Sequence, residues 1–214
     1  MGRRIVIVGN GEVPQGAAEA IDAADMVVRF NECRNFGLSG SRTDVVAVCN
    51  TGRPALMMLS SPEWRASRPV NDCREIWSVR DPEKFRALHP ALMLTHPELA
   101  DFCDDYTDAL AAFAGDIGKT HVIIDRSVHE AVDAALVPFE PGDYVVPSSG
   151  LVVVARVLAQ AEGAGDDVVL TGFSHEGWDG HPFAAERRLV DSYIAAGRLS
   201  RLQRTDFVSP LEGA

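Results

Sequence analysis

The sequence predicts an α/β fold in which a mostly parallel sheet is flanked by helices. Short apolar runs rich in Val and Ile recur along the chain, and segments with helical patterning separate them. Such wholly apolar runs are typical of parallel strands that are buried on both faces. No linker rich in Ser, Gly or Pro divides the 214 residues. We therefore predict one domain over residues 1–214, with a ligand crevice at the carboxyl ends of its strands.

The first half of the chain begins this alternation. Ile5 to Val8 is a β-branched run that ends in Gly-Asn-Gly, as expected of a buried strand that enters a turn. The next expected elements are a helix at 15–23, strands at 26–30 and 44–48, and a helix that follows the turn at 50–54 and ends at Leu59. This order predicts a β-α-β start to a parallel sheet.

The second half continues the pattern to the last strand. Strands are expected at 75–79, 121–124 and 167–171, and helices at 97–113, 128–136 and 147–161. The strand at 167–171 leads into Gly172-Phe173-Ser174 and then into a loop with two histidines.

Composition narrows the function classes. The formal net charge of −11 argues against a general nucleic-acid binder, which needs clustered Lys and Arg. The apolar run near the N-terminus is too short for a signal peptide, and no segment approaches the length of a membrane span. Four widely spaced cysteines without a C-x-x-C pair suggest reduced, buried thiols. We expect a cytoplasmic protein, most plausibly bacterial.

Two loops at the ends of the first strands are candidates for ligand binding. In Gly9-Asn10-Gly11 the glycines let backbone amides approach a phosphate, although the spacing matches neither a dinucleotide fingerprint nor a Walker A loop. A tight turn without a ligand is the alternative. Arg29 and Asn31 end the next strand, where Arg can pair with phosphate and Asn can bond a ribose hydroxyl. A solvated charge at a strand end is the plainer interpretation of Arg29.

The third candidate loop opens a helix. In Pro147-Ser148-Ser149-Gly150 a serine caps the helix, while free amides and a hydroxyl face an anion. A plain N-cap explains the same residues equally well. All three loops are predicted at the same edge of the sheet.

The run from Gly172 to Arg188 contains a candidate general base. Pro182 fits the first helical position, which makes His181 the expected N-cap. The helix dipole there disfavours imidazolium, so the ring stays neutral near pH 7, as a base requires. Glu186 follows in the first turns. A surface helix that happens to begin after His-Pro is an equally good explanation of this run taken alone.

Taken together, these segments resemble the motifs of the sialyltransferases of glycosyltransferase family 29. Residues 6–11, 21–31 and 40–44 resemble the long sialylmotif, and 147–150 through Gly172-Phe173 resembles the short one. His181 to Glu186 matches the H-x-x-x-x-E motif, and His175 to Trp178 lies where a small aromatic and histidine motif is expected. The chain is also similar to small bacterial glycosyltransferase-like proteins labelled urease-operon accessory proteins.

The resemblance implies a Rossmann-like, GT-A-like sialyltransferase variant that is metal-independent and inverting, with a CMP-sugar donor. It implies that His181 deprotonates the acceptor and that His175 stabilises the leaving phosphate, with Glu186 part of the same motif. By position, the nucleotide contacts would come from Gly9, Asn10, Gly11, Arg29, Asn31, Ser148, Ser149 and Gly150. No cofactor is implied beyond the nucleotide-sugar substrate. The partners would be that donor and an unknown hydroxyl acceptor, with a homodimer left open.

This chain departs from the family in two ways. The disulfide that joins the long and short motifs in animal members has no cysteines here, and the span between the last strand and His181 is compressed. Two alternatives therefore stay open. One is a nucleotide-binding accessory protein with little or no transfer activity. The other, less favoured, is a metal-dependent hydrolase using His175, Glu176, Asp179 and His181, whose spacing matches no zinc motif.

Overall fold

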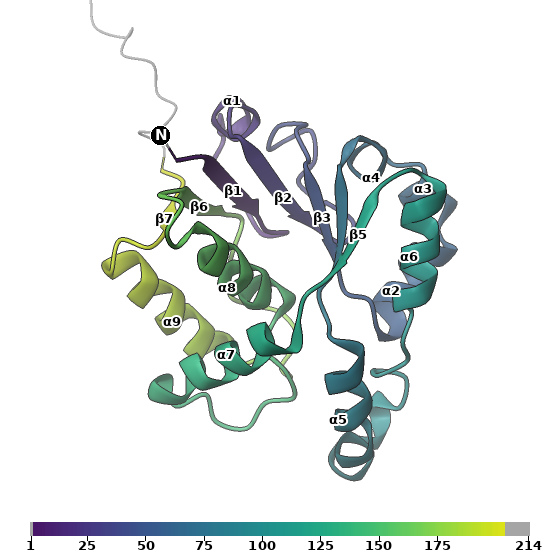
Figure 1. Cartoon of the computed structure of the whole chain (residues 1–214). Helices are drawn as coiled ribbons and strands as arrows, with labels where there is room; N and C mark the ends of the chain where they lie inside the picture. The colour runs from purple at the N-terminus through teal and green to yellow at the C-terminus, as the bar shows by residue number, and fades with distance from the viewer. Residues whose placement is uncertain (1, 204–214) are drawn as a thin grey trace, which may run out of the picture.

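The computed structural model describes residues 2–203, and these form one seven-stranded sheet in the order β5-β4-β3-β2-β1-β6-β7 (Figure 1). Every neighbouring pair of strands is parallel. The strands are β1 (Arg4–Val8), β2 (Met26–Phe30), β3 (Val45–Val48), β4 (Glu75–Ser78), β5 (Thr120–Ile123), β6 (Asp167–Thr171) and β7 (Ser200–Arg201). The predicted α/β fold is confirmed, and the six expected strands begin and end within one residue of their predicted bounds. The strand β7 was missed because two residues are too few to show a pattern.

Helices connect the strands and cover both faces of the sheet. They are α1 (Ala18–Asp22), α2 (Gly52–Ser60), α3 (Pro62–Arg65), α4 (Arg68–Asp72), α5 (Pro82–Thr95), α6 (Thr107–Asp116), α7 (Arg126–Leu136), α8 (Ser149–Ala161) and α9 (Phe183–Ala195), with 3-10 turns η1 (Pro97–Leu99) and η2 (Val137–Phe139). Side chains of α7, α8 and α9 join the core on one face. Those of α2, α4 and α6 and of α1 form cores on the other.

The predicted helix at 97–113 is wrong. The chain makes the turn η1, then an irregular segment, and becomes helical only at Thr107. The irregular segment is bonded to the loop after β3: Gly52 donates from its amide to Asp104 O at 2.8 Å, and Tyr106 N donates to Asn50 O at 3.0 Å. Tertiary hydrogen bonds thus override the local helical pattern.

The helix α5 was missed although its start signals are in the sequence. Asp81 is its N-cap and accepts a hydrogen bond from Lys84 N at 2.7 Å, and Pro82 occupies the first turn. Pro90 lies inside the same helix, and a proline within an apolar pattern argues against a continuous helix there. In Figure 1, α5 lies beyond the carboxyl ends of the strands.

The chain order creates a switch point beside β1. From β1 the chain moves outward through β2, β3 and β4 to β5, and then returns to place β6 on the other side of β1. Loops that leave β1 and β6 therefore diverge to opposite sides, which is where open α/β sheets bind ligands.

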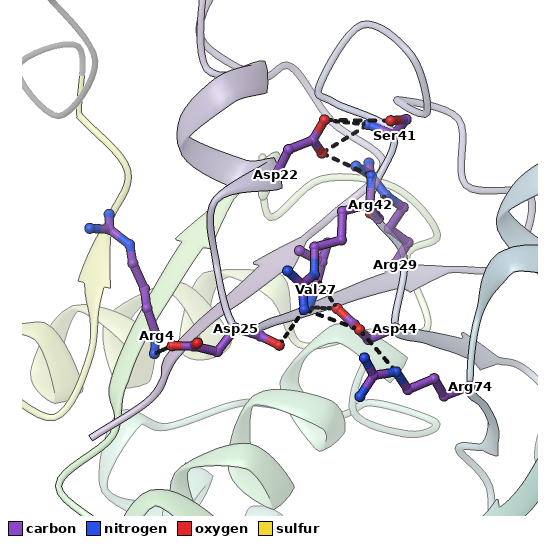
Figure 2. Close-up of polar contacts among 9 residues, drawn as sticks. All are labelled: Arg4, Asp22, Asp25, Val27, Arg29, Ser41, Arg42, Asp44 and Arg74. Atoms are coloured by element: carbon purple, nitrogen blue, oxygen red, sulfur yellow. Dashed lines mark hydrogen bonds and ion pairs between the residues drawn. The ribbon is translucent and has the colours of Figure 1, made fainter. Parts of the chain in front are cut away.

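A polar network fixes the opposite, amino-terminal edge (Figure 2). The buried carboxylate of Asp44 accepts from Val27 N at 2.9 Å and from Arg42 Nε at 2.8 Å, and Arg74 Nε lies 3.6 Å from it. Asp22 accepts from the backbone amides of the loop that precedes Asp44. These bonds hold residues 41–44 against the starts of β2 and β3, away from the carboxyl edge.

Candidate functional site at the carboxyl edge

Three asparagines, each following one of three adjacent strands, connect neighbouring strand ends at the carboxyl edge of the sheet by hydrogen bonds. Asn10, after β1, donates from Nδ2 to the carbonyl of the last β2 residue at 3.4 Å. Asn31, after β2, accepts from the amide that follows β3 at 2.9 Å. Asn50, after β3, accepts from Arg80 N at 2.7 Å and donates to Arg80 O at 2.9 Å. Each asparagine thereby fixes the backbone of the next strand end.

The three asparagines differ in what they leave free. Asn50 is fully buried, and its Nδ2 also donates to Thr107 Oγ1 at 2.6 Å, so it is a structural residue. Asn31 uses only Oδ1, and within residues 2–203 its Nδ2 has no hydrogen-bond partner. Its φ of 49° turns the chain sharply after β2. Of the predicted nucleotide contacts, Asn31 therefore retains two free N–H donors at this edge.

The glycines of the first loop serve close backbone packing. A Cβ on Gly9 would lie 2.2 Å from Gly172 O, and one on Gly11 would lie 2.9 Å from the same oxygen. Gly9 N donates to Thr171 O and Gly11 N to Gly172 O, both at 2.8 Å. Both amides are therefore occupied by the β6 loop rather than free for a phosphate, which is a different use of these glycines from the one expected.

Ser148 and Glu186 connect the start of α8 to α9. Glu186 is 1% exposed, and its carboxylate accepts from Ser148 N and from Ser148 Oγ, both at 2.6 Å. Ser148 Oγ also accepts from Leu151 N at 3.2 Å as the N-cap of α8. Burial raises the pKa of Glu186, while the two bonds from Ser148 act in the opposite direction. Glu186 thus positions the α8 N-terminus and is itself shielded from ligands.

The next two residues keep their amides free. Ser149 N and Gly150 N have no hydrogen-bond partner among residues 2–203, as expected of the first turn of a helix. Gly150 packs against Phe173, and a Cβ there would lie 2.7 Å from the ring. Two donors at the positive end of a 13-residue helix suit an anion.

His181 is held in a single tautomer. Its Nδ1 lies 2.8 Å from Val146 O, and because a carbonyl only accepts, Nδ1 carries the proton and Nε2 keeps its lone pair. Burial lowers the pKa of His181, and Arg80 lowers it further, against the opposing effect of the bond to Val146. The ring is therefore a neutral base at pH 7. The helix starts one residue later than expected: Pro182 is the N-cap of α9 and His181 precedes it.

Aromatic rings surround His181. Trp178 meets it edge-on at 4.9 Å between centroids, and Phe183 does so at 5.3 Å. Trp178 also packs against Phe102 at 5.3 Å. These contacts exclude water from two sides of the ring and account for the burial that depresses its pKa.

His175 has different neighbours. Its Nε2 lies 3.3 Å from Arg201 Nη2 of β7, and its ring lies 6.2 Å from that of Phe173. Burial, followed by the charge of Arg201, lowers the pKa of His175 to about 4. The residue is therefore neutral at pH 7, and any stabilisation of a departing phosphate would come from an N–H group or from Arg201 rather than from imidazolium.

The structure does not place Arg29 with the other expected nucleotide contacts. Arg29 is 1% exposed, and its guanidinium donates to Ser39 Oγ, Ser39 O, Gly40 O and Arg42 O at 2.8–3.1 Å. Its side chain lies on the face opposite Phe30, because successive strand residues alternate. Four of its five N–H donors are thus used on the loop at 39–42, toward which the side chain points in Figure 2, and not on the carboxyl edge.

Arg80 is a residue of this edge that the sequence reasoning overlooked. It follows β4, as Asn10, Asn31 and Asn50 follow their strands, and it is buried between the rings of Phe85 and Phe102. The sequence does carry a signal for Arg80, because a polar residue follows the buried strand predicted at 75–79, as it does at Asn10 and Asn31. The strand at 75–79 was predicted, but Asp81-Pro82 was not recognised as the start of a helix, so the loop that holds Arg80 was not singled out.

A groove of about 870 Å³ lies next to the His181 loop. Residues of α5 and η1 line it, most of them apolar, together with residues 142–145 and 178–180, which include Trp178. Its charged side chains are Glu98, Asp143 and Asp179. The volume is within the range of small-molecule sites.

A relative of the chain identifies its family. It is 56% identical over 201 residues to the urease operon 23 kDa accessory protein of Rhizobium meliloti (strain 1021), and the match covers 94% of this chain and 93% of that protein. The chain belongs to the family of that accessory protein. No family model matches it.

The fold of this chain is similar to that of solved sialyltransferase structures. A mammalian sialyltransferase matches 94% of this chain and 69% of its own, with a TM-score of 0.54 and 18% identity. The sialyltransferase CstII from Campylobacter jejuni, in complex with cytidine-5'-monophosphate, matches 97% and 84% with a TM-score of 0.51 and 12% identity. A single-residue variant of sialyltransferase CST-II in complex with CMP matches 97% and 85% with a TM-score of 0.55, again with 12% identity. At these identities the likeness concerns the fold.

Metal-binding clusters and membrane-spanning helices are both absent from the described residues 2–203. Among residues 2–203, His, Cys, Asp and Glu form no group of three or more that could hold a metal ion, so the His175–His181 loop offers no such cluster. In the same part of the chain no helix has the length and apolarity to cross a membrane.

Proposed function

We propose that this protein is a metal-independent, inverting glycosyltransferase that uses a CMP-sugar donor, with His181 as the general base. The observation that carries the proposal is the bond from His181 Nδ1 to Val146 O, which leaves Nε2 as a base and ties the ring to a residue two positions before the α8 N-cap. A base and an anion site are thereby held by one short segment, 146–150.

The reaction follows from this arrangement. The acceptor hydroxyl gives its proton to His181 Nε2 as its oxygen bonds the anomeric carbon of the donor. The bond from that carbon to the phosphate oxygen breaks, and CMP departs with the electron pair. The amides of Ser149 and Gly150 stabilise the charge that develops on the phosphate. Asn31 contributes free N–H donors to the nucleotide sugar from the end of β2.

Glu186 acts as a positioning residue. By accepting both polar groups of Ser148 it sets the direction of the first turn of α8, and so of the two free amides. The spacing between the two residues places His181 in the loop before α9 and Glu186 in the first turn of that helix.

A second function is favoured by the name of the relative, which assigns it to a urease operon as an accessory protein. In that case the chain binds a nucleotide at the same edge without transferring a sugar.

One assay separates the two. The protein is incubated with CMP-sialic acid, with and without hydroxyl acceptors, and CMP release is measured. An enzyme releases CMP, and His181→Ala abolishes the release while His89→Ala, which changes a histidine of α5, leaves it unchanged. CMP that raises Tm without turnover of any CMP-sugar supports the accessory function. A chain whose Tm does not respond to CMP contradicts both, because a ligand at 100 times its Kd stabilises by about 2.7 kcal/mol.

A further inference from the structure

Arg80 is a buried cation without a counter-charge in the described part of the chain. The residue is 7% exposed, and within residues 2–203 no carboxylate lies within 4.0 Å of it. Its Nη1 donates to Thr51 Oγ1 at 2.5 Å and lies 3.5 Å from Phe102 O, and both are neutral groups. A buried charge is ordinarily paired, so this guanidinium calls for a partner.

Two nitrogens of the Arg80 guanidinium, with three N–H donors between them, remain unused. Nε and Nη2 have no hydrogen-bond partner among residues 2–203, whereas Arg29, at similar burial, uses Nε and both terminal nitrogens on the loop at 39–42. The rings of Phe85 and Phe102 lie 4.8 and 4.2 Å from the Arg80 Cζ and hold the group in place. A preorganised guanidinium with free N–H groups suits a carboxylate or phosphate.

Two separate series of contacts connect His181 to the α8 N-terminus and to Arg80. In the first, the Nδ1 of His181 is bonded to Val146, which leads into α8. In the second, its ring contacts Trp178, which contacts Phe102, the ring that stacks on Arg80. In an inverting displacement the acceptor hydroxyl approaches opposite the leaving phosphate. If the donor phosphate binds at α8, the acceptor is therefore expected at the residues of the second series, which ends at Arg80.

We propose that Arg80 binds an anionic group of the acceptor, a carboxylate or a phosphate, and so selects acidic hydroxyl compounds. This inference rests on the proposed function, because it takes the donor to lie at the α8 N-terminus. The anion pairs with the guanidinium of Arg80, which has no counter-charge in the described residues, and so positions the acceptor hydroxyl beside His181 Nε2.

The test is a binding measurement that needs no turnover. Protein saturated with CMP, and protein without it, are titrated calorimetrically with galacturonate and glucose 6-phosphate and with the matched neutral sugars galactose and glucose. We expect the acids to bind at least about tenfold more tightly than the neutral sugars, as a charge-assisted hydrogen bond implies. Arg80→Gln should abolish this preference. Arg53→Gln, which removes an exposed arginine paired with Asp101, should keep it.

Other results of these titrations would overturn the inference or count against the proposed function. Equal binding of acids and neutral sugars to the wild type, or a preference that persists in Arg80→Gln, overturns the inference. If Arg80→Gln does not fold, Arg80→Lys decides: a clear fall in affinity for the acids supports the proposal, and unchanged affinity contradicts it. CMP affinity should stay within about threefold in these variants, and a tenfold loss would assign the anion at Arg80 to the donor. Failure of CMP to bind the wild type counts against the proposed function instead.

Discussion

The bond between Ser148 and Glu186 gives the sharpest test of how the α8 N-terminus is held. The perturbation is a double-mutant cycle of Ser148→Ala, Glu186→Ala and the double variant. Ser148→Ala removes a 2.6 Å bond to a carboxylate and an N-cap at Leu151 N. With about 1.5–3 kcal/mol for the first and about 1 kcal/mol for the second, unfolding should become easier by roughly 2.5–4 kcal/mol.

Glu186→Ala removes two bonds to one carboxylate, but its cost is reduced by relief of a desolvation penalty. Burial raises the pKa of Glu186, which means that the folded protein disfavours the ionised form. We therefore expect a loss of about 2–4 kcal/mol rather than twice the value of one bond. The coupling energy isolates the contact between Ser148 Oγ and Glu186 Oε2 and should be about 1.5–3 kcal/mol.

The assay is urea denaturation of the four proteins followed by circular dichroism, with CMP affinity measured in parallel. Each single variant should weaken CMP binding, because the amides of Ser149 and Gly150 lose their fixed direction. A coupling energy below about 0.5 kcal/mol would refute the idea that this bond is a significant support. Intact CMP affinity in a folded Glu186→Ala protein would refute the positioning role.

Three further predictions concern separate features. Gly9→Ala should destabilise the fold by about 1–3 kcal/mol in thermal melts, since the added Cβ would lie 2.2 Å from Gly172 O. Gly115→Ala, within α6, places its Cβ against no other atom and should be neutral or stabilising. Equal changes in stability for the two variants would contradict the argument from packing at Gly9. His175 should titrate near pH 4 by NMR. Because its pKa in the folded protein lies below the ordinary value of 6.5, its contribution to stability is full above pH 6.5 and is lost as the pH falls toward 4. A measured pKa near 6.5 would show that Arg201 and burial do not act on it. Arg29→Lys should lower Tm by several degrees, because four hydrogen bonds to the loop at 39–42 are weakened, yet leave CMP affinity within about threefold; a tenfold loss would return Arg29 to the nucleotide site.

Much of the sheet was predictable because its strands are short, apolar and separated by turn residues. The run from Ile5 to Val8 and the run from Val168 to Thr171 are buried on both faces, so their sequence carries the signal directly. The loops that follow them were predicted at one edge for the same reason. The motif spacing also placed His181 beside the start of a helix, with an error of one residue.

Contacts between distant segments were not predictable in this way. Local pattern favoured a helix at 97–113, and bonds from Gly52 and Tyr106 between that segment and the β3 loop prevented it. Arg29 was predicted as a ligand contact, but the alternation of side chains along β2 places it against the loop at 39–42. Glu186 shared a motif with His181, but only the packed structure shows that it holds Ser148 and is closed to ligands.

The sequence by itself determined the parallel α/β sheet, the order of its elements and the loops that gather at its carboxyl edge, because periodicity and turn chemistry are local properties. Only the tertiary structure decided which side chains at that edge are free to bind. Asn50 and the amides of Gly9 and Gly11 are occupied by neighbouring backbone, whereas Asn31, the start of α8, His181 Nε2 and Arg80 keep donors or a lone pair available. That distinction depends on which hydrogen-bond partners meet across the fold, and the partners are far apart in the chain.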